Sequence, residues 1–264
     1  MASVAQVRAF RRRDQKRTTA LVERAAKPLE TKLRSLFMRI ARRELKALLA
    51  SGAGAAIKPE IAKARIAKAL IAIETAELKG LIRTFGLRRI NSAGRTTATT
   101  LGAPGMAIQS EAAETFIAGR TALVDGMITP ISEIIGTTAQ EIIGQAIVEG
   151  GVSTSELSRR LIGNWTGDGG PLSPGRASRI ARTETAAATN YGKMEGYKAA
   201  NVKRIEWVSM DDGNVRDSHD ITGETIAVGE TFSNGLQYPL DPAGPPEEVI
   251  NCRCTALPVF DQGA

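Results

Sequence analysis

Apolar residues recur at steps of three and four positions through much of the first 200 residues of this 264-residue chain. In the first stretch, Leu29, Leu33, Leu36 and Ile40 follow this spacing, and Arg and Lys fill many of the positions between them. Such a period places apolar side chains on one face of an α-helix. The pattern predicts helices over residues 4–50, 58–85, 106–148, 153–162 and 174–200.

Proline and glycine indicate where these helices start, stop or break. Pro28 predicts an interruption within the first helix, and residues 126–130 predict one within the third. Residues 86–105 are polar and lack a period, so we expect a loop there. Residues 163–175 are rich in Gly and Pro and predict a second loop, and Ser173 at its end is placed to cap the following helix.

After Asn201 the period changes to that of β-strands. Short strands are predicted at residues 204–210, 225–228 and 255–259, with a turn at 211–214. Aromatic residues make up only 4% of the chain, which suits a helical body better than an all-β core. We therefore expect an α+β fold, with a long, mainly helical N-terminal region (residues 1–130) and a compact α+β C-terminal domain (residues 131–264) containing a few short strands.

Hydropathy and cysteine usage exclude several classes of protein. The chain contains no run of 18 apolar residues, so no membrane-spanning helix is predicted. The first residues lack the apolar core of a secretory signal. The chain has two cysteines one residue apart, which cannot staple distant parts of a fold. We expect synthesis in a reducing cytoplasm.

Charge is unevenly distributed along the chain. Residues 1–50 hold 14 Lys and Arg against four Asp and Glu, whereas residues 201–264 hold four against 11. A basic block favours an acidic partner such as nucleic acid, although a solvated helix face is an equally good interpretation. The candidate nucleic-acid-binding residues are Arg8, Arg11, Arg12, Arg13, Lys16, Arg17, Arg42 and Arg43.

The strongest chemical signal lies near the end of the chain. His219, the only histidine, and both cysteines, Cys252 and Cys254, fall within the last 46 residues. Neutral imidazole and thiolates are the ligands that structural zinc prefers, and Asp217 or Asp220 would serve as a fourth ligand. The alternative is a buried pair of free thiols beside a hydrogen-bonded histidine.

Other chemistries have less support. The acidic segment 211–217 fails the EF-hand pattern, because Gly213 comes too early and a closing Glu is absent. The Gly-rich residues 163–175 contain no phosphate-binding loop motif. A single histidine leaves no complete set of base, nucleophile and orienting group, so we do not expect catalysis.

The C-terminal residues resemble a known family. Ala181-Arg182-Thr183-Glu184 with Asn190 downstream, Trp207, Arg216 with His219, and the closing Asn251-Cys252-Arg253-Cys254 follow the order and spacing of phage head morphogenesis proteins, the minor head proteins similar to phage Mu protein F. The resemblance spans residues 180–258. The residues that the resemblance places in a structural network are Arg182, Glu184, Asn190, Trp207, Arg216, Asn251 and Arg253.

What the resemblance implies is a virion protein rather than an enzyme. It would lie in the capsid interior or at the portal vertex, bind the portal protein or the major capsid protein, and assist head assembly, DNA packaging or genome delivery. Its basic N-terminal region would contact packaged double-stranded DNA, and the resemblance also favours zinc on His219, Cys252 and Cys254.

Two alternatives remain from the residues and the resemblance. One is an ADP-ribosyltransferase-like effector enzyme, since such domains occur beside this one and an Arg with a Glu belongs to that chemistry. The complete transferase motif is absent, and Glu247 and Glu248 are adjacent rather than separated by one residue. The other is a DNA-binding protein that acts through its basic N-terminal helices alone.

Overall fold

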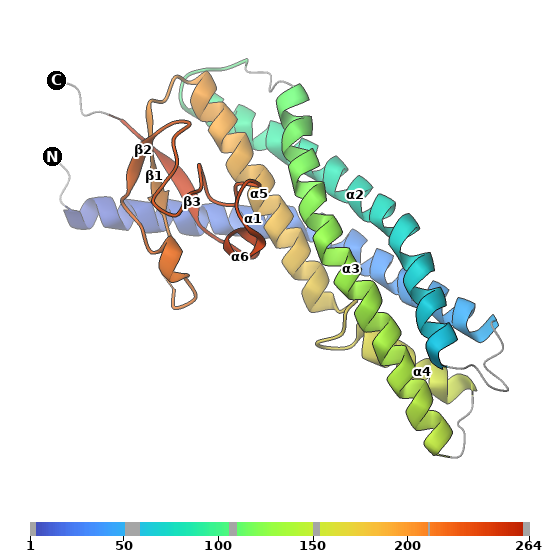
Figure 1. The fold of residues 1–264 in the computed structure, drawn as a ribbon. Helices are drawn as coiled ribbons and strands as arrows, with labels where there is room; N and C mark the ends of the chain where they lie inside the picture. The colour runs from blue at the N-terminus through green and yellow to red at the C-terminus, as the bar shows by residue number, and fades with distance from the viewer. Residues whose placement is uncertain (1–3, 51–58, 106–109, 150–153, 211, 261–264) are drawn as a thin grey trace. The chain divides into compact units, whose positions relative to one another are not determined.

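The computed structural model describes residues 4–50, 59–105, 110–149, 154–210 and 212–260. Within these ranges, it describes the backbone but not the side chains of residues 4–14, 48–50, 59–75, 110, 121–133, 136, 147 and 154. Five long or medium helices precede a small sheet (Figure 1). The elements are α1 (Val4–Ala50), α2 (Pro59–Thr100), α3 (Ser110–Val148), α4 (Thr154–Thr166), α5 (Pro174–Ala199), β1 (Arg204–Val208), η1 (Asp217–His219), β2 (Thr225–Ala227), α6 (Pro246–Val249) and β3 (Thr255–Val259).

The sheet confirms the α+β class expected from the sequence. Its three strands are antiparallel in the order β2-β1-β3. The central strand pairs Ile205 with Ile226 on one side and with Pro258 on the other, and pairs Trp207 with Ala256. Every residue of β1 after Arg204 is buried, as expected for a strand covered on both faces.

The chain divides into two compact units that each combine distant segments. Unit 1 contains residues 1–27, 83–120 and 182–264, and unit 2 contains residues 28–82 and 121–181. The core of unit 1 is built on Trp207, Phe232 and Leu236 of the sheet region, packed with apolar residues of the helices. In unit 2 the fully buried side chains include Leu33 and Trp165. The sequence-based division of the chain at residue 130 stays a prediction.

Two expected breaks are wrong, because α1 and α3 continue through them. Pro28 lies inside α1 and is exposed, while Leu29 and Leu33 beside it are 1% and 0% exposed. A proline inside a helix costs about 3 kcal/mol, which burial of neighbouring apolar side chains can offset. The helix α3 likewise runs unbroken through residues 126–130, whose side chains are outside the described set. At Pro28, packing therefore overrides local propensity.

The predicted loop at residues 86–105 is wrong over residues 86–100, where α2 continues to Thr100, and only residues 101–105 are non-helical. The small residues of this part of α2 pack closely against the glycines of α5. A Cβ on Gly192 would lie 2.5 Å from the Ile90 carbonyl oxygen, and one on Gly196 would lie 2.8 Å from the Gly94 carbonyl oxygen. The polar, small composition therefore serves close helix packing instead of a loop.

The C-terminal elements follow the sequence more closely. The helix α5 begins at Pro174, and its Arg176 N–H donates to Ser173 Oγ at 3.3 Å, as predicted for a cap. The expected helix at 153–162 extends to Thr166, and Ser153 itself lies outside the described residues. The three strands lie where the period predicted them, with β1 and β2 slightly shorter.

Candidate metal centre

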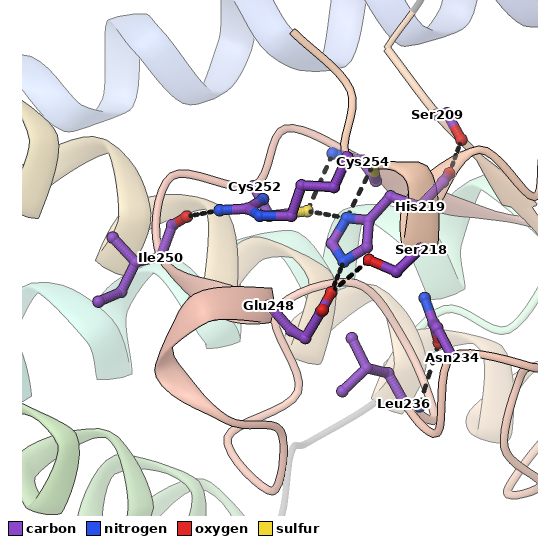
Figure 2. A network of polar contacts seen from close by, with 10 residues as sticks. Ser209, Ser218, His219, Asn234, Leu236, Glu248, Ile250, Cys252 and Cys254 are labelled. Carbon is purple, nitrogen blue, oxygen red and sulfur yellow. Dashed lines mark hydrogen bonds and ion pairs between the residues drawn. The ribbon is translucent and has the colours of Figure 1, made fainter.

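His219, Cys252 and Cys254 meet in the core of unit 1. His219 ends the short helix η1, and the two cysteines lie in the segment that leads from α6 into β3 (Figure 2). Their exposed fractions are 1%, 2% and 6%. One ligand-type atom from each lies within 4.8 Å of the others, and this is the metal-ligand group found among the described residues. The structure thus brings together three residues that the sequence singled out.

The helix α5 anchors the cysteine segment. Asn251 adopts a positive φ of 62°, a conformation that Asn tolerates better than most residues, and its N–H donates to Thr183 Oγ1 at 3.0 Å. Arg182 donates to the Asn251 side-chain oxygen. Asn190 Nδ2 donates to the Cys254 carbonyl at 3.2 Å. These contacts fix the backbone so that both cysteine side chains face His219.

Aromatic and polar contacts also hold the histidine in place. The His219 ring meets Trp207 edge-on, with ring centroids 5.1 Å apart. Ser209 Oγ donates to the His219 carbonyl, and Arg216 Nη2 donates to the Ile250 carbonyl at 2.6 Å, tying the loop before His219 to the segment before the cysteines. The imidazole is therefore oriented by its surroundings.

The distances fit a tetrahedral ion. His219 Nδ1 lies 3.5 Å from Cys252 Sγ and 3.7 Å from Cys254 Sγ. Zinc-to-sulfur and zinc-to-nitrogen bond lengths with a tetrahedral angle require a nitrogen-to-sulfur separation of about 3.6 Å. His219 Nδ1 is thus spaced from both sulfurs as one ion requires, and the group could hold a metal ion.

The other nitrogen of His219 faces a carboxylate. Nε2 lies 2.8 Å from Glu248 Oε2, and Ser218 Oγ donates to the same oxygen at 2.8 Å (Figure 2). Histidines that bind metals commonly present their second nitrogen to a carboxylate, which fixes the ring and strengthens the ligand. Sequence reasoning missed this role of Glu248, because nothing in the sequence distinguishes it from the adjacent Glu247.

The two thiols share one proton. The hydrogen bond with Cys252, together with His219, lowers the pKa of Cys254 to about 5. The hydrogen bond to Cys254, followed by burial, raises the pKa of Cys252 well above its ordinary value. Ionisation of the metal-free pair is therefore favoured at Cys254 and disfavoured at Cys252.

The proposed carboxylate ligands do not join this group. Asp217 and Asp220 are both exposed, at the start and just after the end of η1. Asp212 is paired with Arg253, whose Nη2 donates to its Oδ1 at 2.8 Å, and this hydrogen bonding lowers the pKa of Asp212. Among the described residues, the group whose ligand atoms lie close enough to share one ion consists of His219 and the two cysteines.

The remaining network residue, Glu184, has a partner that the sequence did not indicate. Arg120 of α3 donates to both its oxygens, from Nε at 3.0 Å and from Nη2 at 2.7 Å. Both side chains are buried, Arg120 at 0% and Glu184 at 5% exposure. Arg182, two residues earlier, contacts Asn251 instead. Glu184 therefore stabilises the α3–α5 contact and is not available to a substrate.

The basic residues of α1 fall into three groups. The side chains of Arg8, Arg11, Arg12 and Arg13 lie outside the described residues. Lys16 and Arg17 are exposed in unit 1. Arg42 and Arg43 are exposed in unit 2, where Arg43 pairs with Glu44 at 3.2 Å. Over the residues described, none of the helices is both long and apolar enough to span a bilayer.

A family comparison covers the part of the chain that contains the buried His-Cys-Cys group and most of the sheet. Residues 137–257 match the family described as Phage Mu protein F like protein, so this part of the chain is a Phage Mu F-like domain. The match contains all three metal-ligand candidates and every residue of the predicted network. The family is a structural one of the phage head.

Two curated proteins are similar to parts of the chain. The NAD(+)--arginine ADP-ribosyltransferase EFV of Enterococcus faecalis is 30% identical over 119 residues, which is 42% of this chain and 23% of that protein. The uncharacterized protein YqbB of Bacillus subtilis is 28% identical over 143 residues, 50% of this chain and 45% of that protein. The chain thus spans less than half the length of either relative. No solved structure matches.

Proposed function

We propose that this chain is a minor head protein of a bacteriophage, which binds the portal or the inner capsid surface and assists head assembly, DNA packaging or genome delivery. The match of residues 137–257 to the Phage Mu F-like family carries this proposal. The buried Arg120–Glu184 pair and the α5 anchor of the cysteine segment support a structural role, because they use charged and polar residues for packing.

Quantitative mass spectrometry of purified phage particles tests the proposal. We expect the chain in mature heads at a fixed ratio to the portal protein. Particles made with an early stop codon in its gene should assemble or package DNA poorly, and complementation in trans should restore them. Wild-type heads that lack the chain would contradict the proposal.

The basic part of α1 would contact packaged DNA in this role. Each cation that pairs with a phosphate releases counterions, so removing one such cation should lower the log–log slope of binding against salt by about 0.9. We expect Arg11→Gln, Arg12→Gln and Arg13→Gln together to flatten this slope. The control, Lys203→Gln with Arg204→Gln in the acidic part of the chain, removes two cations and should leave the slope unchanged. An unaltered slope in the triple variant would exclude this role of α1.

The ion that we propose for the candidate centre is zinc. Two thiolates and one imidazole nitrogen are ligands that zinc prefers over magnesium or calcium, which bind through oxygen. Bound zinc would join the loop at His219 to the segment at Cys252 and Cys254. Its contribution would be structural, closing a loop-rich part of the domain.

The relative named as an ADP-ribosyltransferase favours a second candidate function, an NAD-dependent transferase. The geometry gives it less support, because Glu184 is paired with Arg120 and Glu248 lies against His219. The test is transfer of ADP-ribose from labelled NAD to agmatine. Activity in the purified chain that disappears in Glu248→Gln, with folding intact by circular dichroism, would favour the transferase over the structural role.

A further inference from the structure

A second feature of unit 1 is a groove on the surface formed by its helices and the end of its sheet. The groove measures about 690 Å³ and is lined by α1, α2, α5 and the end of β3. Leu21 and Phe260 contribute to its walls with exposed fractions of 46% and 62%. Among the described residues these are the two large apolar side chains that unit 1 leaves exposed. Exposed apolar side chains gathered at a groove are typical of a binding surface.

The groove is also positively charged. Arg17, Arg89 and Lys193 line it, and none of its described lining residues is Asp or Glu. Arg89 is the most informative of the three. Its Nε donates to Thr189 Oγ1 at 2.8 Å, a neutral partner, and burial lowers the pKa of this guanidinium. A partly desolvated cation is stabilised by an anion that arrives with a ligand.

The free edge of β3 is unsuited to pairing with another strand. Tyr197 Oη donates to the Ala256 carbonyl at 3.0 Å, and Asn190 Nδ2 donates to the Cys254 carbonyl, so side chains of α5 already occupy this edge. Pro258, which lines the groove, has no N–H to offer. An occupant must therefore dock through its side chains, as an amphipathic helix does in an apolar groove.

We propose that this groove binds an amphipathic helix of a partner protein, with apolar side chains that pack between Leu21 and Phe260 and a carboxylate that pairs with Arg89 and Arg17. Charge complementarity selects an acidic helix, and the apolar walls disfavour a nucleic-acid backbone, which offers phosphates but no apolar side chains. The proposal does not rest on the assignment to the phage head, since it uses only the lining residues.

A displayed library of random-sequence helical peptides, selected on the full chain, tests the proposal. We expect the enriched peptides to combine apolar residues at helical spacing with Asp or Glu. Measured by fluorescence anisotropy, Arg17→Glu or Leu21→Ser should weaken binding of a selected peptide by about tenfold or more. The matched control is Arg24→Glu, which makes the same charge reversal on the same helix outside the groove, and we expect it to change binding less than about twofold.

Two results would overturn the proposal. One is a selection that yields no peptide whose binding depends on Arg17 and Leu21. The other is binding of short duplex DNA that Arg17→Glu abolishes and that competes with the peptides, which would make the groove a nucleic-acid site. Circular dichroism of each variant shows whether a loss of binding reflects a loss of fold.

Discussion

His219 Nε2 lies 2.8 Å from Glu248 Oε2, while Nδ1 of the same ring faces the sulfurs of Cys252 and Cys254. A carboxylate at Nε2 favours the tautomer that carries its proton there and leaves the Nδ1 lone pair for a metal. We expect Glu248→Gln to weaken zinc binding by about 10- to 100-fold, as loss of such a partner does elsewhere. Competition with a chromogenic chelator measures this affinity.

The neighbouring residue supplies the control. Glu247 lies on the same short helix, α6, and is exposed. Glu247→Gln removes the same formal charge at nearly the same place, so it should leave the affinity for zinc within about twofold of the parent. Equal losses in the two variants would show that general charge, rather than the contact with His219, sets the affinity.

Elemental analysis checks the metal itself. The purified chain should contain about one zinc, and Cys252→Ser or Cys254→Ser should contain none, because each removes one of three protein ligands. A chelator should lower the melting temperature of the parent and leave that of either variant unchanged. Metal-free parent protein with the same melting temperature in the presence and absence of added zinc would exclude a structural ion.

The shared proton of the two thiols makes zinc uptake dependent on pH. With the pKa of Cys254 at about 5 and that of Cys252 raised, Cys252 is the thiol that must lose a proton when zinc binds at pH 8. Isothermal titration in buffers of different ionisation enthalpy at pH 8 should report release of about one proton. Affinity should rise about tenfold per pH unit there and fall more steeply below pH 5, where Cys254 is protonated as well. Release of two protons at pH 8 would contradict the shared-proton arrangement.

The Arg120–Glu184 pair should dominate the electrostatic part of stability in unit 1. Because both partners are buried, Glu184→Gln leaves an uncompensated guanidinium and should cost about 3–5 kcal/mol in the free energy of unfolding. The exposed Arg83–Glu114 pair of the same unit is the comparison, and Glu114→Gln there should cost less than about 1 kcal/mol. Urea unfolding measures both, and similar values for the two variants would refute this ranking.

Close packing of α5 on α2 gives a prediction at Gly192. A Cβ there meets the Ile90 carbonyl oxygen at 2.5 Å, so Gly192→Ala must push the helices apart and should destabilise the chain by about 1–3 kcal/mol. At Gly80, inside α2, a Cβ meets nothing within 4 Å. Gly80→Ala should therefore stabilise by up to about 1 kcal/mol. Thermal unfolding separates the two, and equal shifts would show that the approach is not tight.

The sequence predicted the ligand residues better than their surroundings. His219, Cys252 and Cys254 could be recognised because their residue types are rare in this chain and suit one ion. Glu248 could not, since only the folded chain distinguishes it from Glu247. Asp217 and Asp220 were predicted as ligands because they are near His219 in the sequence. In the structure both are exposed, at the start and just after the end of a short helix.

Helix positions show the same limit. Strands and the Ser173 cap follow from local patterns and were predicted well. The continuation of α2 to Thr100 depends on glycines about 100 residues later in α5, and no local pattern contains that information. The ion pair of Arg120 could not be predicted for the same reason, because its partner Glu184 lies 64 positions away in the sequence.

The composition of unit 1 from residues 1–27, 83–120 and 182–264 has a consequence for biosynthesis. Its contacts are far apart along the chain, and Thr19 Oγ1 reaches Met210 Sδ across 191 positions. During translation, Val22 and the apolar face around it cannot be buried until α5 and β1 have been synthesised. Such long-range closure is slow and leaves apolar surface exposed in the interval. Nascent chains stalled before residue 182 should therefore depend on chaperones.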